Sequence, residues 1–229
     1  MRKALRIMAA VLLALAAVGT GWVVLYRVVP PPLTALMVIR TFDGAGINRD
    51  WVPLDAIAPA LVTAVIAAED TKFCTHHGFD WAAIGDALDG NEDGGPMRGG
   101  STISQQTAKN AFLWPDRTWV RKGMEAGFTA LMEALWPKRR VMEVYLNIIE
   151  WGDGLYGAEA AARAWFHKPA SALTRREAAL MAVVLPNPRR WSPAAPTPFI
   201  ARRAAVIETR MGVVRRDGLD GCVTGSRGG

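Results

Sequence analysis

The stretch LDAIAPALVTAVIAAEDTKFCTHHGFD, residues 54–80, decides the fold of this chain. Its first half predicts a helix, because apolar residues recur with helical spacing at positions 54, 57, 58, 61, 62, 65 and 66. The helix ends at Glu69 and Asp70, which open a polar cluster that continues to His76 and Asp80. Partial negative charge at the end of a helix raises the pKa of a carboxylate and makes it a better proton acceptor. Glu69 is therefore a candidate catalytic base; the alternative is that the acidic pair simply ends the helix in solvent.

The amino end predicts a membrane anchor. Three basic residues precede an uncharged, mostly apolar run over residues 7–26, and Arg27 follows it. About twenty such residues in a helix span the hydrocarbon core of a bilayer, which is about 30 Å thick. The flanking charges orient the amino end toward the cytoplasm and export everything after Arg27. A cleaved signal peptide is the alternative, because residues 14–16, Ala-Leu-Ala, resemble a cleavage site.

The charge of the chain argues against a nucleic-acid-binding protein. The 229 residues include 27 basic and 21 acidic side chains, which gives a net charge of +6. Four basic and no acidic residues lie in residues 1–27, so the exported part carries a net charge of only +2. Nucleic-acid-binding domains usually carry a much larger positive charge, so no nucleic-acid partner is expected.

The chain has two cysteines, Cys74 and Cys222. Neither lies in a pattern with metal-ligand spacing, and two cysteines alone make no disulfide framework. An oxidising compartment permits their pairing, yet the sequence favours two free thiols.

The rest of the sequence predicts a mainly α-helical domain, because signals for strands are scarce. Capping boxes open helices at Thr102 and Thr174, where Gln or Glu follows three residues later. Residues 33–42 predict a strand or an extended approach segment, and residues 89–100 predict a Gly-rich loop. Predicted helices occupy residues 102–112, 118–136, 138–150, 158–166 and a segment from 174 that Pro186 must end. The predicted organisation is a cytoplasmic tip and anchor over residues 1–29, a linker over 30–50, a domain over 51–211 and a disordered tail over 212–229.

The helix after the Gly-rich loop begins with a candidate phosphate-binding turn. Residues 99–106 read Gly-Gly-Ser-Thr-Ile-Ser-Gln-Gln, and Lys109 lies four residues after Gln105 on the same face. Paired glycines let the backbone approach a ligand, and amides at the start of a helix attract anions such as phosphate. The alternative is that the turn and its capping box only shape the fold.

A third cluster combines basic and aromatic residues. Arg117, Arg121, Lys122 and Glu125 lie within about two helical turns, and tryptophans at positions 114 and 119 flank them. Aromatic residues beside basic ones suit a membrane interface that an anionic lipid head group enters. Arg121 and Glu125 are also spaced to pair along the helix, which is a purely structural alternative.

Together these clusters resemble the motifs of one family, the monofunctional biosynthetic peptidoglycan transglycosylases, which are related to the glycosyltransferase domain of bifunctional penicillin-binding proteins. The resemblance covers roughly residues 50–200. The departures are conservative, with Val141 and Met142 at an aliphatic pair and Trp165 at a tyrosine position. The matched motifs are E-D-x-x-F-x-x-H-x-G-x-D at 69–80, G-S-T-I-x-Q-Q at 100–106, R-K-x-x-E at 121–125, K-x-x-I-L-E-x-Y-L-N at 138–147 and G-x-x-G-x-x-x-A-A-x-x-Y-F at 154–166.

The resemblance implies a lysozyme-like helical glycosyltransferase domain, with one N-terminal transmembrane helix and a smaller membrane-facing portion around residues 85–120. It implies a single-pass protein of the bacterial inner membrane whose catalytic domain lies on the periplasmic side. The implied reaction joins disaccharide units of lipid II to a nascent glycan strand by β-1,4 links, in one inverting displacement that releases undecaprenyl pyrophosphate. Other cell-wall synthesis or division proteins are further expected partners.

The resemblance also assigns roles to the candidate residues. Glu69 is expected to take the proton of the acceptor hydroxyl, and Glu125 is a second candidate catalytic carboxylate. A divalent cation, Mg²⁺ or Mn²⁺, is a candidate partner of the pyrophosphate, with no residue assigned to it. The expected substrate-binding residues are Ser101, Thr102, Gln105, Gln106, Lys109, Arg117, Arg121 and Lys122. A lytic enzyme that cleaves peptidoglycan and a non-catalytic, membrane-tethered scaffold are the alternative functions.

Overall fold

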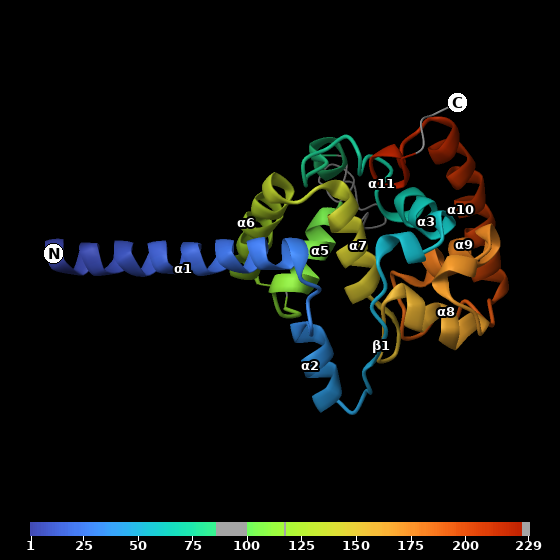
Figure 1. The fold of residues 1–229 in the computed structure, drawn as a ribbon, viewed down its shortest axis with the longest axis horizontal. Helices are drawn as coiled ribbons and strands as arrows, with labels where there is room; N and C mark the ends of the chain where they lie inside the picture. The colour runs from blue at the N-terminus through green and yellow to red at the C-terminus, as the bar shows by residue number, and fades with distance from the viewer. Residues whose placement is uncertain (86–99, 117, 226–229) are drawn as a thin grey trace.

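A long amino-terminal helix, α1 (Arg2–Val28), projects from a helical body in the computed structural model (Figure 1). The structure describes residues 1–85, 100–116 and 118–225. Arg117, most of the predicted loop over 89–100 and part of the predicted membrane-facing portion therefore lie outside the described residues. Within those ranges α1 is the one helix long and apolar enough to cross a membrane, and 6% of its apolar window is buried. By length and composition, it has the properties of the predicted anchor.

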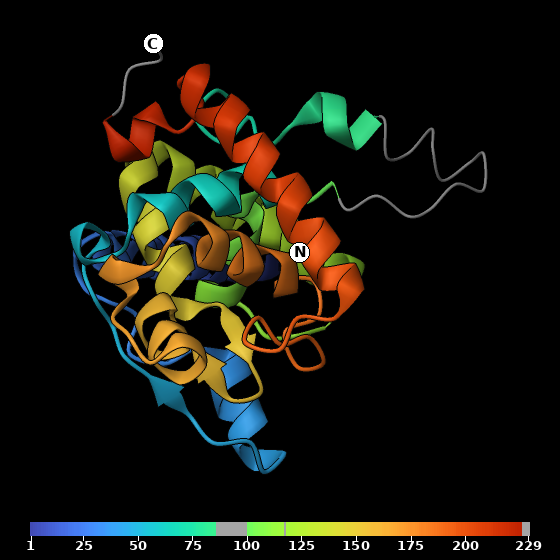
Figure 2. The same cartoon turned by 90° about the vertical axis from the view of Figure 1, so that its right-hand side faces the viewer.

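The body is built around α3 (Pro59–Glu69), whose side chains from Leu61 to Ala67 are all buried. The predicted start of this helix at Leu54 is a separate 3₁₀ turn, Leu54–Ala56, because Pro59 begins α3 itself. The other described helices of the body are α5 (Ile103–Phe112), α6 (Trp119–Leu135), α7 (Lys138–Ile148), α8 (Ala158–Phe166), α9 (Arg175–Val184), α10 (Pro198–Arg216) and α11 (Gly221–Thr224). Helices α9 and α10 cover α3, as Figure 2 shows for α10, and α5 packs against α6 and α7. The predicted helical architecture is confirmed, including both capping boxes.

The carboxyl-terminal turns of α1 are fixed to this body. Val23 is fully buried, and the Trp136 side chain donates a hydrogen bond of 2.9 Å to its carbonyl oxygen. The Tyr26 ring stacks on Phe112 with centroids 5.7 Å apart, and Trp22 meets Phe112 edge-on at 5.6 Å. Because these contacts join α1 to α5 and to the end of α6, the anchor fixes the orientation of the body.

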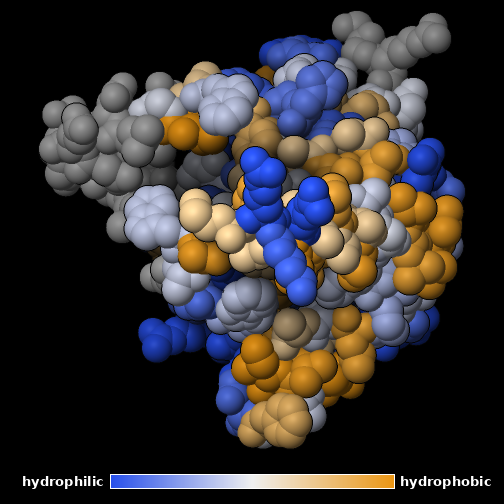
Figure 3. Space-filling view, turned by 90° about the vertical axis from the view of Figure 1, so that its left-hand side faces the viewer, coloured by the Kyte–Doolittle hydropathy of each residue, from blue (hydrophilic) through white to orange (hydrophobic). Residues whose placement is uncertain are grey.

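The segment after the anchor is helical, which corrects the prediction of a strand or an extended segment over residues 33–42. Helix α2 (Ala35–Phe42) begins at Thr34, whose side chain accepts a hydrogen bond of 3.2 Å from the Met37 amide. Met37 is fully buried, whereas Phe42 is exposed. The N-cap and one buried apolar residue therefore outweigh the extended preference of the preceding prolines. Figure 3 looks along α1 from its amino end and shows apolar side chains on the face where α2 lies.

A small three-stranded sheet, in the order β1-β3-β2, closes one end of the body. Strand β1 (Asn48–Arg49) pairs parallel with β3 (Leu155–Tyr156), which pairs antiparallel with β2 (Glu150–Gly152). The turn between β2 and β3 requires Gly154, because its φ is +67° and a Cβ there would lie 2.3 Å from the Gly46 carbonyl oxygen. Since β1 belongs to this sheet, the folded body begins before Trp51, within the predicted linker.

The predicted disordered tail over residues 212–229 is wrong for the residues that the structure describes. Helix α10 continues through Gly212 to Arg216, and α11 follows it. The apolar stripe of α10 ends at Val214, which is 1% exposed, and Asp220 accepts a hydrogen bond of 2.6 Å from the Thr63 hydroxyl of α3. A glycine such as Gly212 suggests the end of a helix in a sequence. Buried residues before and after it stabilise α10, so the helix continues.

The prediction of two free thiols is also wrong, because Cys74 and Cys222 form a disulfide with Cα atoms 5.6 Å apart. Cys74 lies in the loop that follows α3, and Cys222 lies in α11, which folds back onto that loop. The two positions are 148 residues apart, so no local spacing could reveal the pair. The bond ties the carboxyl-terminal helices to the segment that carries the first motif.

Removing this disulfide should destabilise the protein. Cys74→Ser or Cys222→Ser opens a loop of 148 residues, whose closure stabilises a fold by about 3–5 kcal/mol. Denaturant unfolding of the purified protein in detergent, followed by circular dichroism, measures the loss. A reductant should lower the stability of the natural chain to that of the variants and leave the variants unchanged. Equal stability of all three proteins without reductant would contradict the assignment of the bond.

Candidate active site

The Glu69 side chain lies at the carboxyl end of α3, where two hollows meet. One hollow of about 250 Å³ lies between Glu69 and α10, and Arg203 and Arg210 of α10 line it. The other, of about 150 Å³, is lined by Glu69, Ser101 and Asp80 among others. Glu69 is half-buried, so its carboxylate can meet a ligand from either side.

The pKa of Glu69 is raised, mainly because burial disfavours the charged carboxylate. The neighbouring Asp70 raises the pKa further, whereas the hydrogen bond from Gln106 and the charges of Arg203 and Lys109 lower it. Gln106 Nε2 donates to Glu69 Oε2 over 2.9 Å. The predicted direction of the shift is confirmed, but its main cause is burial of the carboxylate, which only the packed structure supplies.

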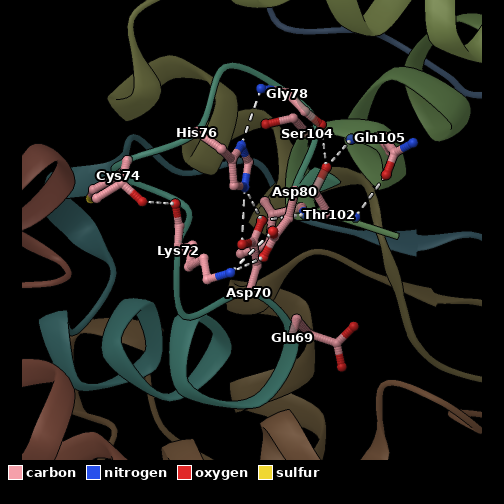
Figure 4. Close-up of polar contacts among 12 residues, drawn as sticks. Glu69, Asp70, Lys72, Cys74, His76, Gly78, Asp80, Thr102, Ser104 and Gln105 are labelled. Atoms are coloured by element: carbon pink, nitrogen blue, oxygen red, sulfur yellow. Dashed lines mark hydrogen bonds and ion pairs between the residues drawn. The ribbon is translucent and has the colours of Figure 1, made fainter. Parts of the chain in front are cut away.

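Asp70 points the other way and holds the first motif together, as Figure 4 shows. Its carboxylate lies 2.9 Å from His76 Nε2 and accepts a hydrogen bond of 3.0 Å from the Ile103 amide at the start of α5. The Gly78 amide donates to His76 Nδ1 over 3.1 Å, so the ring proton is on Nε2 and faces Asp70. Asp70 therefore connects the end of α3, the motif loop and α5.

The same loop packs closely against α6. Gly78 has a φ of +90°, and a Cβ at this position would lie 2.8 Å from the Thr129 methyl group of α6. A side chain at position 78 would therefore be strained by its backbone conformation and would also clash. The glycine of the first motif thus has a structural cause that does not involve a ligand.

The predicted phosphate seat at the start of α5 is already occupied by the protein itself. The Thr102 hydroxyl donates to the Gly78 carbonyl oxygen over 2.7 Å and accepts from the Gln105 amide, while Gln105 Oε1 accepts from the Thr102 amide. With the Ile103 amide bonded to Asp70, the anion at this helix start is a carboxylate of the chain. Thr102 and Gln105 are buried and act on the frame of the site, whereas Ser101 is exposed in the hollow beside Glu69.

The structure brings four of the predicted charged residues together on α5 and α6. Lys109 and Arg121 line a cavity of about 420 Å³. Burial lowers the pKa of Lys109, and the charge of Glu125 opposes this shift. Glu125 is 3% exposed and pairs with Arg121 over 3.1 Å and with Lys122. Glu125 thus holds cations in place, which is a different task from that of Glu69.

Two cations that the sequence did not suggest also face the site. Arg203 and Arg210 lie seven residues apart on α10 and line the hollow beside Glu69. Their spacing is two helical turns, which places them on one helix face. The signal was present in the sequence, but α10 itself was not among the predicted helices, so no face could be assigned to them.

The described residues offer no ready-made metal centre. No group of three or more His, Cys, Asp and Glu side chains in the described ranges converges in a way that could hold a metal ion. The groups gathered at the site are the half-buried Glu69 carboxylate, the Gln106 amide that holds it and the cations on both sides.

Three of the relatives found by comparison with known proteins illustrate how much of this chain is matched. A protein of Rhodospirillum centenum named biosynthetic peptidoglycan transglycosylase is 64% identical over 222 residues, which cover 96% of each chain. A protein of Caulobacter vibrioides with the same name is 52% identical over 97% of each chain. Another of that name, from Pseudomonas fluorescens, is 54% identical over 86% of this chain and 84% of its own.

The site combines the Glu69 carboxylate with cations on both sides of it, in a helical body that carries one apolar helix at its amino end. The family model described as transglycosylase matches residues 36–212 of this chain. The chain belongs to the transglycosylase family and is a glycosyltransferase.

Loss of the Asp70 carboxylate should loosen this frame. Asp70→Ala leaves the buried His76 ring and the Ile103 amide without their partner, which costs about 1–3 kcal/mol of the free energy of unfolding. Asp55→Ala is the matched control, because the Asp55 side chain is 86% exposed and its surface ion pair contributes less than about 1 kcal/mol. Denaturant unfolding compares the two variants, and equal losses would show that Asp70 does not anchor the motif.

Proposed function

We propose that this glycosyltransferase is a peptidoglycan glycosyltransferase of cell-wall biosynthesis that polymerises lipid II into β-1,4-linked glycan strands. The observation that carries the proposal is the Glu69 carboxylate, which is desolvated, held by Gln106 and open to two hollows. The names of the relatives support peptidoglycan as the substrate class. Lipid II as the donor and acceptor rests on the motifs shared with the family.

Glu69 is suited to take the proton from the 4-hydroxyl group of the acceptor sugar. A carboxylate with a raised pKa binds that proton more strongly than an ordinary glutamate does. As the proton moves to Glu69, the acceptor oxygen forms a bond to the anomeric carbon of the donor. The bond from that carbon to the pyrophosphate breaks, and its electron pair leaves with undecaprenyl pyrophosphate. One base is enough for this single inverting displacement.

The cations of α5 and α6 are suited to receive the departing pyrophosphate. Negative charge grows on the leaving group, and fixed positive charges stabilise it. Lys109 and Arg121 line the cavity of about 420 Å³, and Glu125 orients Arg121 and Lys122. A Mg²⁺ or Mn²⁺ ion held by the phosphate oxygens of the substrate stays a prediction, and no step here depends on it.

The proposal locates the body on the periplasmic side of the inner membrane, with α1 crossing the bilayer. The basic residues in the first turns of α1 favour a cytoplasmic amino end. Val38, Ile39 and Phe42 of α2 are exposed. Figure 3 shows apolar side chains on the face from which α1 emerges, where α2 lies. An enzyme held there meets a lipid-linked substrate without extracting it from the membrane. Binding of other cell-wall synthesis or division proteins stays a prediction.

Glu69→Gln should abolish polymerisation. The glutamine keeps the size of the side chain but cannot accept the hydroxyl proton, so the rate should fall by about 10²- to 10⁴-fold. A gel assay of glycan products from purified lipid II measures this. Glu208→Gln is the control, because Glu208 of α10 pairs with Arg176 and lines none of the three hollows described above. This variant should retain its rate. An active Glu69→Gln protein would sink the proposal, and release of soluble fragments from cell-wall sacculi would favour the lytic alternative.

The raised pKa of Glu69 should also appear in two pH profiles. The base must be ionised, so polymerisation should fall as pH drops through a value above about 4.3, the ordinary pKa of glutamate. A raised pKa in the folded state means that stability is lost as pH rises through that value. Glu69→Gln should therefore unfold at a higher denaturant concentration than the natural chain at neutral pH, with the difference vanishing in acid. A less stable variant at neutral pH would contradict the burial argument.

A further inference from the structure

A chain of hydrogen bonds links three helices behind Glu69. Tyr145 of α7 is 1% exposed, and its hydroxyl lies 3.3 Å from Gln106 Oε1 of α5. Gln106 Nε2 donates to Glu69 Oε2 of α3 over 2.9 Å. Among the residues that the structure describes, the Tyr145 hydroxyl makes no second hydrogen bond.

The direction of these two hydrogen bonds depends on whether Glu69 is protonated. An ionised carboxylate only accepts hydrogen bonds, so it requires the NH₂ end of the Gln106 amide. The carbonyl end then faces Tyr145, whose hydroxyl donates to it, so each of the two hydrogen bonds has a donor and an acceptor. A protonated Glu69 would favour the flipped amide, but the Tyr145 hydroxyl would then accept from the amide and leave its own buried proton without a partner. Tyr145 therefore favours the setting in which Glu69 is ionised.

We propose that Tyr145 is a positioning residue, whose hydroxyl fixes the Gln106 amide so that it donates to Glu69 and keeps this carboxylate ready to accept the proton of the substrate. The inference rests on the proposed function of Glu69 as base and adds a residue that never touches the substrate. Burial of Tyr145 supports the role, because it raises the pKa of the phenol well above its usual range and keeps the hydroxyl proton in place.

Other charged groups face Glu69 and stay constant when Tyr145 is changed. They are Asp70 at the end of α3, Lys109 of α5 and Arg203 of α10, with Arg210 in the same hollow. None of them makes a hydrogen bond to Gln106 within the described parts of the chain. A change at Tyr145 therefore acts on Glu69 through the amide.

The test is the pH dependence of lipid II polymerisation by Tyr145→Phe in the full chain. The variant keeps the buried ring and removes one hydroxyl, so the acidic limb of the kcat profile should move up by about half to one pH unit, with KM unchanged. Tyr156→Phe is the matched control, because the Tyr156 hydroxyl is also buried but has no hydrogen-bond partner in the described structure. Its profile should not move.

A double variant separates action through Gln106 from a general loss of packing. Gln106→Met keeps the shape of the side chain without the amide, and its acidic limb should move by at least as much as that of Tyr145→Phe. Adding Tyr145→Phe to Gln106→Met should then produce no further shift. Shifts that add, or an unmoved limb in Tyr145→Phe, would overturn the proposal.

Two outcomes keep this inference distinct from the proposed function. If Glu69→Gln is inactive and Tyr145→Phe has the profile of the natural chain, the role of Tyr145 fails and the base survives. If Glu69→Gln is active, the proposed function fails, and the inference about Tyr145, which rests on it, fails with it. If Tyr145→Phe does not fold, the pH profile of Gln106→Met decides. An acidic limb that does not move in this variant would show that the Gln106 amide does not affect Glu69, and the proposal would fail.

Discussion

The carboxylate of Asp70 is the contact on which the site depends. It pairs with the His76 ring and accepts a hydrogen bond from the Ile103 amide. One buried carboxylate thus joins the end of α3 to the start of α5. This junction determines where the two neighbours in sequence point, with Asp70 inward and Glu69 into the hollows (Figure 4). A free helix start would attract a phosphate, but here an internal carboxylate satisfies it. The cations that we propose to bind the anionic substrate lie elsewhere, on α5 and α6.

Burial gives the site its chemistry as well as its geometry. Desolvation raises the pKa of Glu69, and the same effect lowers that of Lys109. Burial thus makes the charged form of each group less favourable than it is in water. Ion pairs counteract this cost for Arg121 and Lys122, which share Glu125. The natural chain accepts a destabilised carboxylate at the position where we propose that a proton is taken up.

Much of the fold was predictable from local pattern. The spacing of apolar residues and the capping boxes at Thr102 and Thr174 predicted α3 and the helices from α5 to α9, because each signal acts within one or two turns. The tail, the linker and the cysteines were mispredicted for a shared reason. Helix α2, the end of α10 and the Cys74–Cys222 bond are stabilised by partners far away in sequence, and no local pattern reports such partners.

The sequence by itself determined the helical class, the apolar anchor segment and the family, through ordered motifs that include Glu69, Gln106 and Glu125. The tertiary structure alone decided which of the motif residues face a hollow and which face the protein. It turned Thr102 and Gln105 inward, added Arg203 from α10 and supplied the desolvation that raises the pKa of Glu69. The reason is physical: residue type and spacing fix what a side chain can do, whereas burial and long-range neighbours fix what it meets.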